Sequence, residues 1–306
     1  MSSYHELSAR QRIPHLFDAG SFEEFLPPGA RVVSPHLAQL DAPVSFDDGV
    51  VVGRGLLDGQ VVFGAAQEGG FMGGAVGEVH GAKLVGMLGR AVIENAHAVL
   101  LLLESGGVRL HEANAGLIAV SEVMRAILDV RAAGIPVIVA VGGANGCFGG
   151  MGIAARCANT VIMSEEGRLA MSGPEVIETA NGVEEFDARD RALVWRTTGG
   201  KHRYLLGDCQ ALVADDTGAF RQAAIAAIAA VYSGKAAGEV ALSLAELLAE
   251  QEMLARRLRD FGGQIEPMEV WRALGVPDPN VITMLEADAF VALADKHRAG
   301  GGAGGQ

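Results

Sequence analysis

The chain has 306 residues, which suits one large α/β domain or two small ones, and it carries a formal net charge of −13. This acidic balance disfavours binding to nucleic acid or to an anionic membrane surface, and apolar runs such as residues 98–103 are too short to span a bilayer. The three cysteines form no Cys-x-x-Cys pair and the first twelve residues hold no apolar signal core, so we expect a cytoplasmic protein without a metal site.

Residues 1–30 are expected to contain a short amphipathic helix that stops at Pro27-Pro28-Gly29. Two β-rich runs follow, at residues 50–57 and 60–66, and the Asp58-Gly59 pair between them is a strong hairpin signal. Glycine accounts for 42 of the 306 residues, about twice its usual share. The glycines cluster between apolar runs, which indicates sharp turns or close backbone approaches.

The rest of the chain alternates helical and strand patterns. Its continuous apolar strands indicate burial on both faces, as in a parallel α/β sheet. The expected elements are, in chain order, a helix at 75–97, a strand at 98–104, a helix at 113–132, strands at 137–141, 160–163 and 168–171, and helices at 174–180, 187–198, 217–232, 243–260 and 286–298.

We divide the chain into four parts. They are an N-terminal helical and extended segment, a core, a helical C-terminal extension and a Gly-rich tail, at residues 1–45, 46–235, 236–298 and 299–306. The tail is expected to be disordered. A Lys-Ala-Ala-Gly linker between two helical patterns leaves open a break at residues 233–238.

A glycine-rich stretch follows the predicted hairpin. Gly73, Gly77 and Gly81 recur every four residues, so on a helix they would form one stripe without side chains. Such a stripe serves tight helix packing, or it lets a ligand lie against the backbone. A helix that begins at Gly74 would also present free N–H groups to an anion. We therefore expect substrate contacts at Gly73, Gly74 and Gly77.

Two further glycine turns lie where buried strands end. Gly106-Gly107 follows the strand at 98–104, and Gly149-Gly150 comes soon after the strand at 137–141. Ligands of parallel α/β sheets collect beyond the carboxyl ends of the strands. Each turn alone is a routine strand-to-helix connection. Together they predict backbone N–H donors that converge on an oxygen as it gains negative charge, an oxyanion hole.

Polar side chains near these turns offer weaker signals. Arg109, His111 and Glu112 are expected to meet a substrate carboxylate or a partner chain. The basic residues 201–203 suit a phosphate or a solvated surface patch. No Gly-x-Ser-x-Gly elbow is present, and the histidines show no metal-ligand spacing, so the sequence indicates neither a serine nucleophile nor a metal centre.

The glycine motifs together resemble the carboxyltransferase signature of acyl-CoA carboxylases, within the crotonase superfamily. The resemblance covers roughly residues 50–215. It rests on four segments in the same order, namely residues 71–77 with Gly81 and Lys83, residues 105–109, Gly149-Gly150, and residues 172–178.

Within that family the chain is most similar to β subunits of biotin-independent malonate decarboxylases. It shows no four-cysteine zinc ribbon of the acetyl-CoA carboxylase β subunit, its segment 110–114 departs from that subunit, and its tail after Ser233 is longer. The resemblance implies a crotonase-like spiral of ββα units with a helical C-terminal extension. It also implies a γ subunit of the same fold, with the active site between the two, and no tightly bound cofactor. The malonyl group would be carried on an acyl-carrier subunit by a phosphoribosyl-dephospho-coenzyme A arm.

The resemblance implies a decarboxylase that stabilises an enolate with backbone N–H groups near Gly106-Gly107 and Gly149-Gly150. Three alternatives remain open at this point. A biotin-dependent carboxylase or decarboxylase subunit would share the thioester site. An enoyl-CoA hydratase or isomerase would need acidic residues beside it, for which Glu112 is an ambiguous candidate. A non-catalytic scaffold would use the glycines for packing alone.

Overall fold

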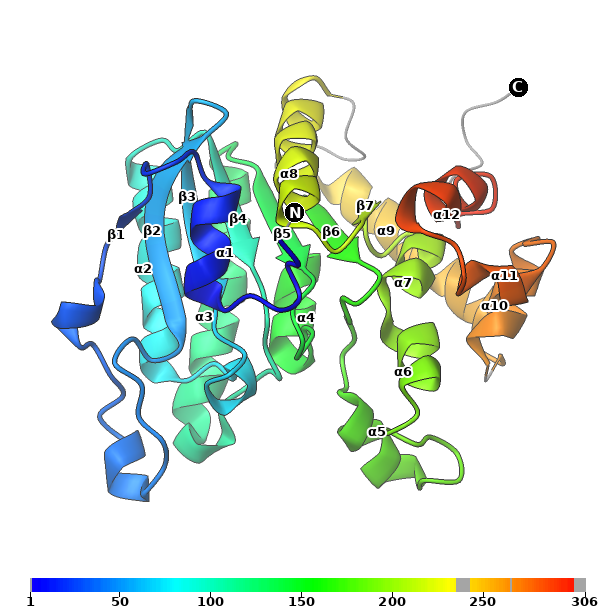
Figure 1. Cartoon of the computed structure of the whole chain (residues 1–306), viewed down its shortest axis with the longest axis horizontal. Helices are drawn as coiled ribbons and strands as arrows, with labels where there is room; N and C mark the ends of the chain where they lie inside the picture. Colours follow the sequence, from blue (N-terminus) through cyan, green and yellow to red (C-terminus); the bar gives the residue numbers. More distant parts are fainter. Residues whose placement is uncertain (1, 235–242, 265, 300–306) are drawn as a thin grey trace.

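The computed structural model describes residues 2–234, 243–264 and 266–299 (Figure 1). Its strands form one seven-stranded sheet in chain order. The first three strands are antiparallel neighbours, and β3 to β7 run parallel. The strands are β1 (Glu23–Glu24), β2 (Val50–Leu57), β3 (Gln60–Gln67), β4 (Ala98–Leu102), β5 (Val137–Val141), β6 (Thr160–Ser164) and β7 (Ala211–Val213).

Helices cover both faces of the sheet (Figure 1). Helices α2, α3 and α4 pack on one face, and α1 and α8 pack on the other. The helices are α1 (Ala9–Leu16), α2 (Glu78–Ile93), α3 (Asn114–Ala132), α4 (Gly149–Arg156), α5 (Pro174–Asn181), α6 (Arg191–Thr198), α7 (Gly200–Leu206), α8 (Thr217–Tyr232), α9 (Leu244–Phe261), α10 (Pro267–Ala273), α11 (Pro279–Ile282) and α12 (Ala287–Ala294).

Burial on both faces explains why the central strands are apolar at every position. In β4, Val99 and Leu101 belong to the core under α2 and α3, whereas Leu100 and Leu102 belong to the core under α1 and α8. Side chains of a strand point alternately to opposite faces, so a strand between two helical layers needs apolar residues throughout. The predicted parallel α/β class is confirmed.

A second, shorter row of pairings runs beyond the carboxyl ends of the parallel strands. Parallel bridges join Val76 to Val108, Ser105 to Cys147, and Cys147 to Leu169. Each unit of the fold therefore contains a long strand, a bridge segment and a helix, which is the ββα repeat expected of the spiral. The glycine turns lie in this second row, so the repeat itself places them side by side.

The hairpin prediction is confirmed residue for residue. Strands β2 and β3 pair from Val50–Gln67 to Leu57–Gln60, and both turn residues have positive φ, 52° at Asp58 and 73° at Gly59. A two-residue turn with two positive φ angles matches the twist of the flanking strands, which is why Asp-Gly is favoured there.

Three other predictions were wrong in detail. The helix expected at 75–97 begins only at Glu78, because the preceding glycines are not helical. The β-rich piece 168–171 contributes isolated bridges and no strand. The helix expected at 187–198 begins at Arg191 and ends before Gly199, whose ψ of 164° is extended, and α7 follows.

Helices α10, α11 and α12 contact the core through a few apolar side chains, whereas α9 has no buried residue. Trp271 of α10 and Phe290 of α12 are both buried in the core that α2 and α3 also share. We therefore keep the division into a core and a C-terminal extension as a proposal. The possible break at 233–238 falls largely outside the described residues, as does most of the tail expected to be disordered. None of the described helices is long and apolar enough to cross a membrane.

Candidate active site

The two predicted glycine turns lie in direct contact. The Phe148 N–H donates to the Ser105 carbonyl at 2.7 Å. A methyl group added at Gly107 would lie 3.2 Å from the Gly149 Cα, and one added at Gly149 would lie 3.1 Å from the Gly107 Cα. Both glycines have positive φ, 113° and 59°. Only glycine adopts these angles readily and permits so close a backbone approach.

Two of the four predicted N–H donors are already engaged. The Gly106 N–H donates to the Gly73 carbonyl at 2.8 Å, and the Gly149 N–H donates to the Met171 carbonyl at 2.9 Å. These two groups fix the turns to neighbouring segments, because each forms an ordinary backbone hydrogen bond. The assignment of Gly106 and Gly149 as oxyanion donors is therefore corrected to a structural role.

The other two predicted donors remain candidates. The Gly107 N–H donates a hydrogen bond to the Ser105 Oγ at 3.1 Å, and this acceptor is a rotatable hydroxyl two residues earlier, not a carbonyl of another segment. The Gly150 N–H has no hydrogen-bond partner within the described part of the chain. A methyl group on Gly107 would lie 3.6 Å from the Gly150 nitrogen, so the two candidates are neighbours.

Gly150 occupies the first turn of α4. The first N–H groups of a helix have no partner inside the helix, and the helix dipole adds partial positive charge there. The Met151 N–H is likewise without a partner among the described residues. This donor was not predicted, because no helix was expected at residues 149–156. Val120 of α3 borders the site, 2.6 Å from a methyl group built on Gly150, so one wall is apolar.

The glycine stretch after the hairpin is hydrogen-bonded to the segment that carries Gly107. The Val76 N–H donates to the Gly107 carbonyl at 2.8 Å, and the Arg109 N–H donates to the Val76 carbonyl at 2.9 Å. Gly73 and Gly74 form a 3-10 turn with φ of 65° and 68°. The predicted helical glycine stripe is therefore wrong, since of its three glycines only Gly81 lies inside α2.

The predicted anion site at a helix beginning at Gly74 is also wrong. Helix α2 begins at Glu78, with Gly77 as its N-cap. Its free N–H groups are capped by the chain's own carboxylates, since the Glu78 N–H donates to Glu112 and the His80 N–H donates to the Asp48 Oδ2 at 2.9 Å. A side chain at Gly77 would displace Glu112, because an added methyl group would lie 2.2 Å from its Oε2.

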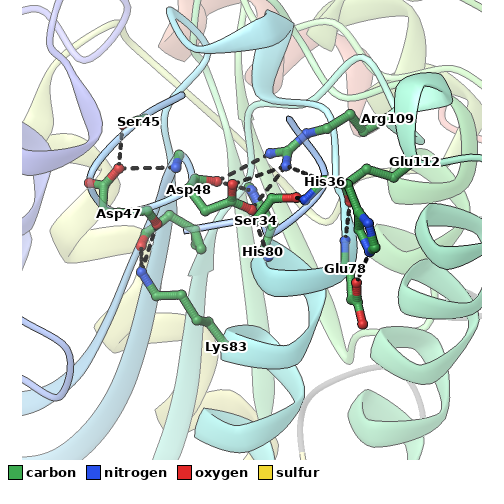
Figure 2. A network of polar contacts seen from close by, with 12 residues as sticks. Ser34, His36, Ser45, Asp47, Asp48, Glu78, His80, Lys83, Arg109 and Glu112 are labelled. Atoms are coloured by element: carbon green, nitrogen blue, oxygen red, sulfur yellow. Dashed lines mark hydrogen bonds and ion pairs between the residues drawn. The ribbon is translucent and has the colours of Figure 1, made fainter. Parts of the chain in front are cut away.

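Arg109 and Glu112 belong to a buried network of polar contacts (Figure 2). The Arg109 Nη1 lies 3.0 Å from the Asp48 Oδ2 and 3.2 Å from the Glu112 Oε1, and all three side chains have no exposed surface. Their predicted contact with substrate is therefore corrected, because each charge is already met by a partner inside the fold. The burial of Asp48 raises the pKa of its carboxyl, while Arg109 opposes that shift.

Two basic side chains of α2 extend the same network. The His80 Nδ1 lies 3.0 Å from the Asp48 carbonyl and its Nε2 lies 3.0 Å from the Gln67 Nε2, which fits a neutral imidazole. Burial, aided by the charge of Arg109, lowers the pKa of His80 to about 3. The Lys83 Nζ donates to the Asp47 carbonyl at 2.8 Å, and burial lowers the Lys83 pKa. These contacts tie α2 to the segment before β2.

Glu104 is an acidic residue beside the site that the sequence prediction missed. Its carboxylate pairs with Arg12 of α1 and accepts the Asn145 N–H at 3.0 Å. The side chains of Arg12 and Glu104 are 1% and 6% exposed, so this is a buried ion pair. In the sequence, Glu104 could have been noticed as the one charged residue of the predicted strand at 98–104. The pair holds the turn after β5 against the end of β4.

Comparisons with known proteins decide the family. The carboxyl transferase domain family matches residues 4–228. The chain belongs to the carboxyl transferase domain family. A malonyl-S-ACP:biotin-protein carboxyltransferase of Malonomonas rubra is 39% identical to it over 97% of this chain and 97% of the relative.

Solved structures agree with this assignment. A crystal structure of a Pseudomonas malonate decarboxylase hetero-tetramer in complex with malonate has a TM-score of 0.77 and 44% identity, over 86% of this chain and 93% of that chain. A transcarboxylase 12S structure with methylmalonyl-coenzyme A and methylmalonic acid bound has a TM-score of 0.61 and 25% identity, over 74% of this chain and 41% of that chain. The predicted carboxyltransferase-type fold is confirmed.

The remaining predicted residues of this carboxyl transferase are divided between surface and interior. His111 is exposed, on the turn after Arg109. Lys201, His202 and Arg203 are not a phosphate site or a solvated patch, because Lys201 pairs with Glu165 at 2.7 Å and the other two bond inside the fold. In the described ranges, no cluster of three or more His, Cys, Asp or Glu side chains is arranged to hold a metal ion.

Alanine at Gly74 is expected to destabilise this carboxyl transferase far more than alanine at Gly73. Both glycines have left-handed φ, which costs a side chain about 1–2 kcal/mol. A methyl group at Gly74 would also lie 1.9 Å from the Glu104 carbonyl oxygen, whereas Gly73 has open space. Chemical denaturation of Gly74→Ala and Gly73→Ala measures the difference. Equal losses of stability would show that the segment shifts freely away from β4.

Proposed function

We propose that this chain is the subunit of a malonate decarboxylase that converts a malonyl thioester to an acetyl thioester and CO2. The proposal rests on the Gly150 N–H at the start of α4, which has no hydrogen-bond partner among the described residues and lies directly beside Gly107. The family match and the likeness to Pseudomonas malonate decarboxylase support it. The thioester oxygen would accept hydrogen bonds from Gly150 and Gly107, with Met151 as a third donor.

Decarboxylation of a malonyl thioester requires hydrogen-bond donors to the thioester oxygen, and no base is needed to begin it. The bond between the carboxylate carbon and the α-carbon breaks, CO2 leaves, and the electron pair delocalises onto the thioester oxygen as an enolate. Preorganised N–H groups stabilise that charge as it develops, and an apolar wall such as Val120 strengthens the effect by excluding water. The enolate carbon then takes one proton to give the acetyl thioester.

The proposed assembly contains other subunits. A γ subunit of the same fold would complete the active site, and an acyl-carrier subunit would deliver the malonyl group on a phosphoribosyl-dephospho-coenzyme A arm, in the cytoplasm. The hetero-tetramer of the Pseudomonas enzyme supports such an assembly. His111 is exposed and Leu110 beside it has 81% of its surface exposed, so this predicted substrate contact would be accessible to the malonyl group or the γ subunit.

The alternative functions require different groups beside the thioester oxygen. A hydratase or isomerase needs a free carboxylate there, and Glu112 is held by Arg109 and the start of α2. A scaffold would need no unpaired donor at Gly150. The second candidate that a specific observation favours is transfer of the carboxylate to biotin, because the Malonomonas rubra relative is named for that reaction.

Release of CO2 in the presence of avidin distinguishes the two. The purified complex is incubated with a malonyl thioester labelled in the free carboxylate. A biotin-independent decarboxylase releases labelled CO2 at the same rate with and without avidin. Inhibition by avidin, reversed when the avidin is saturated with biotin beforehand, would assign the chain to the biotin-dependent reaction.

A further inference from the structure

Helix α9 exposes its apolar side chains to solvent. Five of its leucines are 41–73% exposed and form a leucine stripe, namely Leu244, Leu247, Leu248, Leu254 and Leu258. The part of the chain that the structure describes buries no residue of α9. A surface helix of a globular protein normally turns its apolar side chains toward the core, so α9 lies the other way round. A contiguous exposed apolar patch is typical of a surface that binds another macromolecule.

Charged side chains attach α9 to the core instead. The Arg257 Nη1 lies 3.1 Å from the Asp208 Oδ1, and the Arg156 Nη2 lies 3.9 Å from the Glu250 Oε1. The Arg257 side chain is 15% exposed, whereas the neighbouring Leu258 is 73% exposed. The charged face of α9 therefore packs on the core, and the leucine stripe faces away from it.

Four of the five leucines are arranged symmetrically about Gln251. Leu248 and Leu254 lie three residues before and after it. Leu244 and Leu258 lie seven residues before and after it. Spacings of three, four and seven residues place side chains on one face of a helix. Two α9 helices that packed antiparallel about Gln251 would therefore set leucine against leucine on both sides of the centre.

The charges of α9 favour the antiparallel direction. Residues 244–252 contain three glutamates and no basic residue, whereas residues 253–261 contain three arginines and Asp260. An antiparallel pair places each acidic half against a basic half, and a parallel pair would place like charges together. The pattern of α9 is thus complementary to a second α9 in the reverse direction.

A groove beside the leucine stripe offers further apolar surface. It has a volume of about 440 Å³ and lies between α7, α9 and α10. The apolar part of its lining is Leu206, Leu254, Leu258, Phe261, Pro267 and Val270. The groove borders only the C-terminal half of the stripe. In an antiparallel pair this half faces the N-terminal half of the other helix, whose leucines would enter the groove.

We propose that two copies of this chain associate through their α9 helices, packed antiparallel along the leucine stripes with the two Gln251 side chains on the twofold axis. Such an interface is isologous, because the same surface is used by both copies. Amide side chains both donate and accept hydrogen bonds, so the two glutamines bond to each other and fix the register. The pairing is separate from the proposed chemistry at Gly150, and neither depends on the other.

The molar mass of the purified complex, measured by analytical ultracentrifugation over a range of concentrations, tests the pairing. We expect the wild-type complex to contain two copies of this chain. Leu248→Glu/Leu254→Glu would place four carboxylates in the apolar interface, so the dissociation constant should rise at least about a hundredfold. Ile93→Glu/Met284→Glu is the matched control, because both residues lie outside α9 and are 85% and 83% exposed. It should keep two copies.

Cysteine substitutions test the direction of the helices, with the wild-type chain as the control for its own three cysteines. Under mild oxidation Gln251→Cys should form a disulfide between two copies. Leu244→Cys should not, because its two copies would lie about 21 Å apart along the helix axis, at about 1.5 Å a residue. A disulfide in Leu244→Cys and none in Gln251→Cys would contradict the antiparallel pair.

Three results of the ultracentrifugation would overturn the proposal. The first is one copy of this chain per wild-type complex at every concentration. The second is unchanged self-association of Leu248→Glu/Leu254→Glu. The third is loss of a different subunit from that variant, which would show that the leucine stripe binds that subunit and not a second copy of this chain.

Discussion

Arg109→Ala should lower the free energy of unfolding by about 3–5 kcal/mol, the usual cost of breaking a buried ion pair by removing one partner. Asp48 and Glu112 have no exposed surface, and Arg109 lies between them. Its loss leaves two buried carboxylates facing each other without a compensating charge. Urea denaturation monitored by circular dichroism measures the effect.

Arg125→Ala provides the comparison. Arg125 also contacts two carboxylates, Glu122 and Asp129, but its side chain is 57% exposed. Surface ion pairs contribute about 0–1 kcal/mol, so this variant should unfold almost as the wild type does. If Arg109→Ala kept wild-type stability and instead raised KM for the malonyl thioester, Arg109 would be a substrate ligand, as the sequence first suggested.

The parallel core was predictable because its signals are local. Continuous apolar strands, the Asp58-Gly59 turn and glycines at strand ends each report on a few neighbouring residues. The ββα repeat then brings Gly107 and Gly149 together, since consecutive turns of the spiral end at the same edge. The proximity of the two glycine turns therefore followed from fold class alone.

The roles of individual groups were not predictable in this way. Three glycines spaced four residues apart suit one face of a helix, but Gly73 has a positive φ of 65° and belongs to a turn before α2. Arg109 looked free for substrate because its partner Asp48 lies 61 residues earlier. Which N–H groups remain unpaired depends on such long-range contacts, as when the Met171 carbonyl engages the Gly149 N–H.

The largest effect on catalysis is expected from removal of the Gly150 N–H. Gly150 is the second residue of α4, a position where proline is tolerated because its N–H has no helical partner. A side chain there would meet Val120, 2.6 Å from the added methyl group, so the substitution is made together with Val120→Ala. Loss of one oxyanion donor typically lowers kcat by about 10²–10³.

Gly150→Ala/Val120→Ala is the matched control, because it adds a side chain and keeps the N–H. The same design does not suit Gly107, whose φ of 113° proline cannot adopt. Both Gly150 variants must be shown by circular dichroism and co-purification to be folded and assembled with their partner subunits before rates are compared.

The rate of malonyl thioester decarboxylation in a single turnover, compared between these two variants, tests whether the Gly150 N–H stabilises the enolate. We expect the proline variant to release CO2 about 10²–10³ times more slowly than the alanine variant. Equal rates in two folded, assembled complexes would mean that the Gly150 N–H does not stabilise the enolate, and the proposed oxyanion site would be contradicted.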